Sequence, residues 1–112
     1  MGATTAHAAA VRLTAPACRS DIATAQVDIA AAEAANTAGD AGTALTDDNK
    51  VTADLTAAAG DCANEPFPVP QEIAVAQTLN ATVTALDSVG NTRAAGRSLA
   101  ILKSFVNDIF ER

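Results

Sequence analysis

The chain has 112 residues, a formal net charge of −6, and alanine as its most abundant residue, so it can form one domain with a modest core. The acidic balance and the scattered placement of the seven Lys and Arg residues argue against a nucleic-acid-binding surface. No apolar run approaches the roughly 18–20 residues that cross a bilayer, so we expect no membrane span.

The N-terminal segment, residues 1–17, is expected to be loosely ordered, and residues 18–112 to form a helical domain. The segment consists mostly of small residues and includes Pro16, and only Val11 and Leu13 could pack it against a core. The single histidine, His7, also lies there and is expected to be solvated.

A first helix is predicted to begin at Ser20 and to fade around Asn36. Ser20 suits the N-cap, and Asp21 in the first turn meets the positive end of the helix dipole. Gly39 is expected to cap the C-terminus. The apolar residues at heptad-like spacing are Ile22, Ala25, Ile29 and Ala32.

A second helix is predicted after Thr46, which can serve as its N-cap, with Asp47 and Asp48 in the first turn. Four residues then fall on one face of this helix, namely Val51, Leu55, Ala58 and Cys62. The segment ANEPFPV, residues 63–69, breaks the helical pattern because its two prolines cannot donate backbone hydrogen bonds.

A third helix is predicted from Pro70 to about Gly90, since proline suits the first helical position. Its expected apolar face holds Val75, Leu79, Val83 and Leu86, with Ile73 and Val89 beside them. The triplet Asn80-Ala81-Thr82 fits the glycosylation sequon, although a place inside a helix argues against its use. The remaining acidic residues, Asp87 among them, are interpreted as solvated.

The fourth helix is predicted to begin between Thr92 and Ser98, and it has the strongest amphipathic pattern in the chain. Its core or interface residues are Leu99, Leu102, Phe105, Val106, Ile109 and Phe110. Such a wide apolar face must contact several neighbours. With alanine favouring helix and the connections short, we predict an all-α fold, an Ala-rich antiparallel up-down four-helix bundle.

The two cysteines are predicted to form a disulfide that ties the first helix to the second. Cys18 precedes the first helix and Cys62 ends the second, and these two points lie side by side in an antiparallel hairpin. The alternative is two unrelated buried thiols. A disulfide would indicate an extracellular or other oxidising compartment. Two thiols and one distant imidazole cannot supply the four ligands of a structural zinc site, so no metal is expected.

The sequence contains no recognisable catalytic motif and no phosphate-binding glycine loop, so no enzyme activity and no cofactor are expected. We therefore interpret the chain as a structural or binding module for an unknown protein or a hydrophobic ligand. It would be a monomer or a homodimer through the C-terminal helix.

The C-terminal segment SFVNDIFER, residues 104–112, resembles the start of the long central helix of core histone 2B, and the preceding GRSLAILK is similar to the entry into that helix. The resemblance covers Ser98–Arg112. It implies dimer-core roles against histone 2A for Leu102, Phe105, Val106, Ile109 and Phe110, and a place near the DNA backbone for Arg97 and Ser98. A chromatin-related dimerisation protein is thus the alternative function. Because residues 1–90 share nothing with that family, we favour a helix borrowed by an artificial or chimeric chain.

Overall fold

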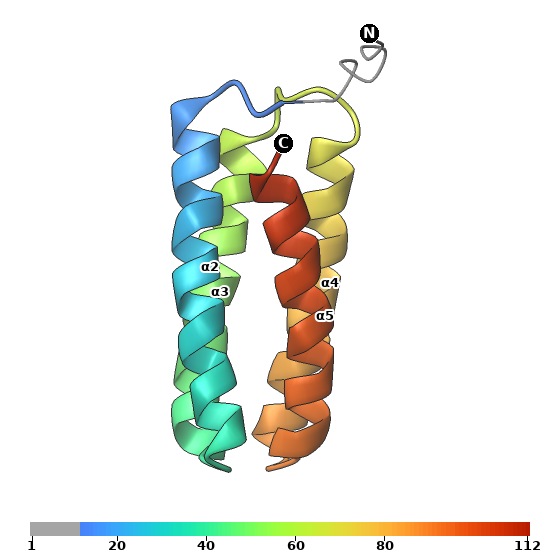
Figure 1. The fold of residues 1–112 in the computed structure, drawn as a ribbon. Coiled ribbons are helices and arrows are strands. Elements are labelled where there is room, and N and C mark those ends of the chain that lie inside the picture. The colour runs from blue at the N-terminus through green and yellow to red at the C-terminus, as the bar shows by residue number, and fades with distance from the viewer. Residues whose placement is uncertain (1–11) are drawn as a thin grey trace, which may run out of the picture.

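The computed structural model describes residues 12–112, so the predictions for His7 and Val11 lie outside the described residues. The described part of the chain forms four helices and no strand: α2 (Pro16–Thr37), α3 (Ala41–Asp61), α4 (Val69–Ser88) and α5 (Thr92–Phe110). Figure 1 shows these helices packed lengthwise against one another. The prediction of an all-α four-helix bundle is confirmed.

Each helix packs against two others, because α2 contacts α3 and α5, and α4 contacts the same two. The bundle is elongated, with extents of 49 × 27 × 18 Å. In Figure 1 the start of α2, the α3–α4 connection and the C-terminus lie at the upper end, and the two other connections lie at the lower end. None of the helices described is long and apolar enough to cross a membrane.

The helix starts differ from the predicted ones. Helix α2 begins at Pro16, before the expected N-cap Ser20, because a proline in the first turn lacks only an N–H that would have no helical partner. Helix α3 begins before Thr46, because Asp40 is its N-cap and accepts a hydrogen bond from the Thr43 backbone N–H at 3.1 Å. The predicted cap at Gly39 is confirmed by its positive φ of 73°.

The hydrophobic core runs the length of the bundle and is closed at the upper end by the predicted disulfide. Cys18 and Cys62 are fully buried, and their Cα atoms lie 4.8 Å apart across the bond. The bond joins the first turn of α2 to the residue that follows α3. The largest fully buried apolar side chains are Ile22, Ile29, Val51, Leu55, Val69, Ile73, Val83, Leu99, Leu102, Val106 and Ile109.

The predicted apolar face of α4 was correct for Val83 and Ile73, which are buried, but wrong for Val75 and Val89. Val75 is 46% exposed and Val89 is 77% exposed, whereas two polar residues, Asn80 and Asp87, are buried. The face that packs inward contains Val69, Ile73, Ala76, Asn80, Val83 and Asp87. Leu79 and Leu86 pack at the edge of the core. The polar residues interrupt the apolar stripe, so the hydrophobic pattern alone selects a face that is rotated from the true one.

Residues 13–17, expected to be loosely ordered, are held at the upper end of the bundle. The Glu65 carboxylate accepts hydrogen bonds from the backbone N–H groups of Thr14 and Ala15, each at 2.8 Å, and from the Thr14 hydroxyl. Leu13 is buried and donates its N–H to the carbonyl oxygen of Arg112. The prediction failed here because the anchoring carboxylate lies far away in the sequence.

Candidate functional site

A cleft opens between α2 and α5 near the lower end of the bundle, with a volume of about 550 Å³. The α2 side and its C-terminal connection contribute Glu33, Asn36, Thr37 and Gly39. The α5 side contributes Thr92, Arg93, Gly96, Arg97 and Ala100. Six of these nine residues have polar or charged side chains, although more of the lining surface is apolar than polar.

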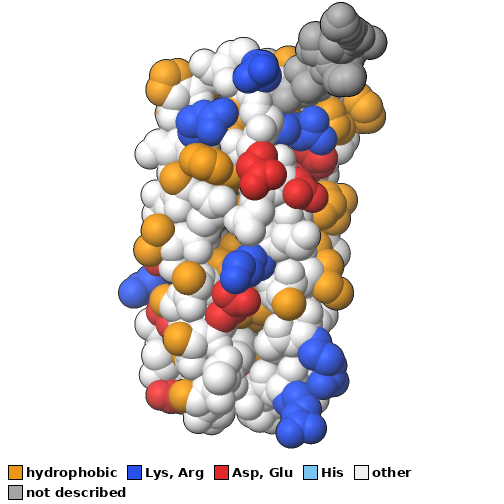
Figure 2. All heavy atoms as spheres, in the orientation of Figure 1, with side chains coloured by type: hydrophobic (Ala, Val, Ile, Leu, Met, Phe, Trp, Pro, Cys, Tyr) orange, Lys and Arg blue, Asp and Glu red, His pale blue; other side chains and the backbone are white. Residues whose placement is uncertain are grey.

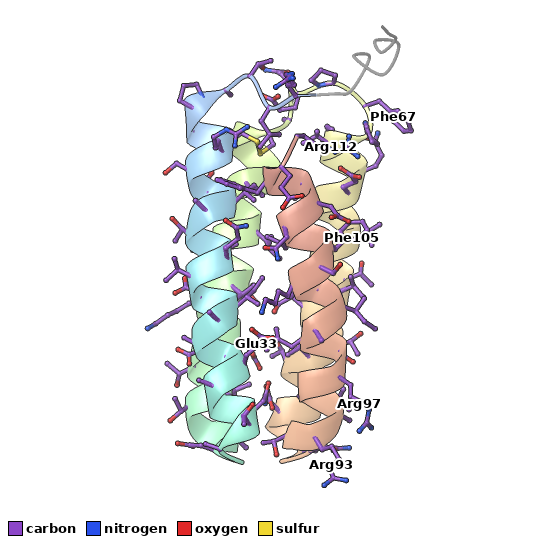
Figure 3. All side chains as sticks on the ribbon, viewed as in Figure 1. Glu33, Phe67, Arg93, Arg97, Phe105 and Arg112 are labelled. Atoms are coloured by element: carbon purple, nitrogen blue, oxygen red, sulfur yellow. A yellow bond between two sulfur atoms is a disulfide. The ribbon has the colours of Figure 1, made fainter. Side chains whose placement is uncertain are left out.

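Two arginines stand at the α5 rim of the cleft, one helical turn apart. Asn91 caps α5 by accepting a hydrogen bond from the Ala94 N–H at 3.2 Å, so Arg93 and Arg97 fall in the first two turns of the helix. Both are exposed, and neither forms an ion pair within residues 12–112. Figure 3 shows both extending from the lower end of α5 into solvent, and Figure 2 shows the basic side chains gathered there.

The two arginines supply the positive charge at this rim. The N-terminal end of α5 carries a partial positive charge, and the C-terminal end of α2, which lines the same cleft, carries a partial negative charge. Arginines one turn apart also repel each other weakly. The rim is therefore a local basic feature of a chain whose net charge is −6.

Glu33 carries the negative charge of the cleft, but it already has a partner. Its carboxylate lies 3.2 Å from the Lys103 ammonium group of α5, and this ion pair links the two helices. Figure 3 shows Glu33 between α2 and α5. The ion pair leaves the two arginines as the charges at the cleft without a counter-ion among the residues described.

Buried polar side chains lie beneath the cleft. Asn36, which is 7% exposed, lines the cleft and donates a 2.6 Å hydrogen bond to Oδ1 of Asp87 on α4. Helix α5 packs closely over this contact, since a Cβ added at Gly96 would lie 3.7 Å from the Asn36 Cβ. The cleft is therefore connected through Asn36 to a carboxyl group in the bundle interior.

Asp48 of α3 is the second carboxyl group in this interior. It is fully buried, and neither of its carboxyl oxygens receives a hydrogen bond from the described residues. Burial raises the pKa of Asp48 to about 8, and the neighbouring carboxyl of Asp87 and the charge of Asp47 add to this effect.

Asn80 extends the polar side chains to the opposite side of the bundle. Its amide donates to the Thr52 hydroxyl at 2.8 Å and to the Asp48 backbone oxygen at 3.3 Å. A small recess of about 100 Å³ is lined there by Thr52, Leu55, Thr56, Gln77, Asn80 and Ala81. Polar side chains consequently pass through the interior from the α2–α5 cleft to this α3–α4 recess.

The residues that the sequence singled out as core or interface lie on one face of α5, away from the cleft rim. Leu99, Leu102, Val106 and Ile109 are fully buried. Phe105 and Phe110 are partly buried against the core. The Arg19 guanidinium lies 4.9 Å from the centre of the Phe110 ring. These side chains are part of the protein's own core.

The burial of the polar residues Asn36, Asp48, Asn80 and Asp87 was not predicted from the sequence. Asp87 was expected to be solvated and Asp48 to lie in the first turn of its helix, but both are buried within helices. The available signal was spacing, because Asn80 and Asp87 continue the heptad that starts at Ile73. Asn80 is 2% exposed, so the sequon there is inaccessible in the folded protein.

Within residues 12–112, no group of three or more His, Cys, Asp or Glu side chains is arranged to hold a metal ion. Comparisons with protein-family models, with curated protein sequences and with solved structures found no match.

Proposed function

We propose that this protein is a non-enzymatic binding module that holds an acidic segment of a partner protein at the α2–α5 cleft. The observation that supports this function is the pair of exposed arginines at the rim of a polar cleft, without acidic counter-ions in the described chain. The disulfide supports placing the binding module in an oxidising compartment, such as the extracellular space.

An acidic group suits the rim because each guanidinium can form two parallel hydrogen bonds to one carboxylate. Arg93 and Arg97 extend outward and do not close over the cleft, so they are placed to reach a large partner that lies along the surface.

A hydrophobic ligand is less well suited to this site, because it would leave the two arginines at the rim without a counter-ion. The histone-like alternative would need Leu102, Val106 and Ile109 to face a partner. These three side chains are fully buried against the other helices, so such a dimer would require the bundle to open. A homodimer through the same face of α5 would require the same opening.

Titration of the isotope-labelled protein with a peptide of ten glutamates, followed by NMR, tests the proposal. We expect shifts confined to the cleft residues and an affinity that falls steeply as salt rises, because the attraction is electrostatic. The double variant Arg93→Gln/Arg97→Gln should lose most of the binding. Arg12→Gln, which removes an exposed arginine outside the cleft, should retain it.

Steric blocking provides a second test. Ala100→Phe places a ring in the cleft, whereas Ala85→Phe places the same ring at an exposed position of α4. Only the first should weaken peptide binding. Binding that survives both the arginine and the Ala100 variants would refute the cleft as the site. Binding of laurate, with no response to the glutamate peptide, would favour a hydrophobic ligand instead.

A further inference from the structure

Pairs of aspartates face each other across the interfaces that α3 makes with its neighbours. On α3, Asp54 and Asp61 are at heptad spacing, and on α2, Asp21 and Asp28 have the same spacing. The carboxyl of Asp21 faces that of Asp61, which is exposed, and the carboxyl of Asp54 faces that of Asp28, both half-buried. The Asp48–Asp87 pair between α3 and α4 is the third. Helix α3 thus contributes one carboxyl to every pair.

Several oxygens of these pairs are buried and receive no hydrogen bond from residues 12–112. They are Oδ2 of Asp21, Oδ2 of Asp54, Oδ2 of Asp87 and both carboxyl oxygens of Asp48. Two ionised carboxylates at such a position would repel each other, and neither could supply a donor. One proton held between the two groups removes the repulsion and provides the missing donor, as in other carboxyl dyads.

The described basic side chains do not neutralise these pairs. Around Asp48, the facing groups are Asp47 on the same helix and Asp87 and Asn80 on α4, with Asn36 of α2 bonded to Asp87. Lys50 is exposed and lies 3.9 Å from Asp47.

The α2–α3 pairs are likewise surrounded by acids, since Asp54 is acted on by both Asp28 and Asp21. The neighbouring cations already have partners, because Arg19 donates to the Phe110 carbonyl oxygen and Lys103 pairs with Glu33.

We propose that the three carboxyl pairs make this bundle more stable at acidic than at alkaline pH. Protons shared within the pairs hold α3 against α2 and α4. When these protons are lost as the pH rises, α3 packs less tightly against its neighbours. The inference is independent of the cleft and of what binds there.

The direction of the pH dependence follows from the shifts. Burial, followed by the facing carboxyl, raises the pKa of Asp21 to about 6, of Asp54 to about 7 and of Asp48 to about 8. A carboxyl whose pKa is raised on folding contributes stability that is complete below its ordinary value of 3.8. That contribution is lost as the pH rises above this value and through the folded value, so stability should fall between about pH 4 and pH 8.

Two other carboxylates set the lower end of the pH range in which the protein is most stable. Hydrogen bonds from Thr14 lower the pKa of Glu65, and hydrogen bonds from Thr43 lower the pKa of Asp40. Their contributions are present above the ordinary carboxyl pKa and are lost as the pH falls below it. The most stable condition should therefore lie near pH 4–5, below the usual range of about pH 5–8.

Thermal unfolding of the oxidised protein, followed by circular dichroism at constant ionic strength, tests the proposal. We expect the melting temperature to fall by roughly 10 °C or more from pH 5 to pH 8. Asp48→Asn keeps the shape of the protonated carboxyl and cannot ionise. It should flatten much of this dependence and melt above the wild type at pH 8.

Asp54→Asn should flatten another part of the dependence of melting temperature on pH. This variant provides the test if Asp48→Asn does not fold. Asp108→Asn, at an exposed position of α5, should leave the slope unchanged. His7→Gln should also leave it unchanged, since histidine ordinarily titrates in this range. In hydrogen exchange corrected for intrinsic rates, α3 should lose more protection than α5 as the pH rises. A melting temperature that stays constant or rises from pH 5 to pH 8 overturns the proposal. So does a dependence of melting temperature on pH that is the same in Asp48→Asn and Asp54→Asn as in the wild type.

Discussion

Replacing both cysteines, as Cys18→Ala/Cys62→Ala, measures how much the bundle depends on its covalent link. The disulfide joins residues that are 44 positions apart. In the chain-entropy description, closing a loop of this length in the unfolded chain corresponds to about 4 kcal/mol at 25 °C. A domain of this size has a net stability of about 5–15 kcal/mol. We therefore expect a folded protein whose melting temperature is lower by roughly 15–30 °C.

Urea denaturation of the oxidised wild type and of the double variant gives the free-energy difference directly. The reduced wild type is the matched control, because it lacks the bond but keeps both sulfur atoms, and it should resemble the variant. A loss below 1 kcal/mol in both proteins would refute the reasoning. It would mean that the Glu65 hydrogen bonds to Thr14 and Ala15 already hold the start of α2 beside the end of α3.

Four further substitutions test the core and the upper end of the bundle. Leu102→Ala removes a fully buried side chain and should lower the free energy of unfolding by about 2–5 kcal/mol. Ile101→Ala, at a position that is 59% exposed, should change it by no more than about 0.5 kcal/mol. Urea denaturation measures both changes. Phe105→Ala should fall between them, because that ring is only partly buried; equal losses at all three positions would contradict the burial. Glu65→Gln should cost about 1–3 kcal/mol at pH 7, because the charge-assisted hydrogen bonds to Thr14 and Ala15 weaken. The difference between variant and wild type should shrink below about pH 4, where Glu65 itself gains a proton, and a pH-independent difference would contradict this origin.

The sequence was most informative where large apolar side chains repeat with the helical period. Four of the six residues chosen on α5 are fully buried, and α5 contacts two helices, α2 and α4. Helices α2 and α3 could be recognised from their alanine content, but small side chains on every face give little contrast. Their starts were misplaced because Pro16 and Asp40 compete with the equally plausible caps Ser20 and Thr46.

The buried polar residues could not be predicted from the sequence for a different reason. An aspartate is expected at the surface because an isolated buried carboxylate is costly. A carboxyl whose pKa is raised by burial avoids much of that cost, and its neighbours are distant in the sequence, as Asp87 is from Asp48. The cleft was missed as well, because it depends on the approach of α2 to α5 and the motif around Arg93 and Arg97 is not distinctive.

The hydrogen bond between the Leu13 N–H and the Arg112 carbonyl oxygen brings the two ends of the described chain together at one pole of the molecule. The cleft lies at the other pole, beside the α2–α3 and α4–α5 connections. A tether attached at either terminus would therefore leave the arginine rim facing outward. A short linker between the two ends would give a circular permutant with new termini at one of the lower connections and the four helices intact.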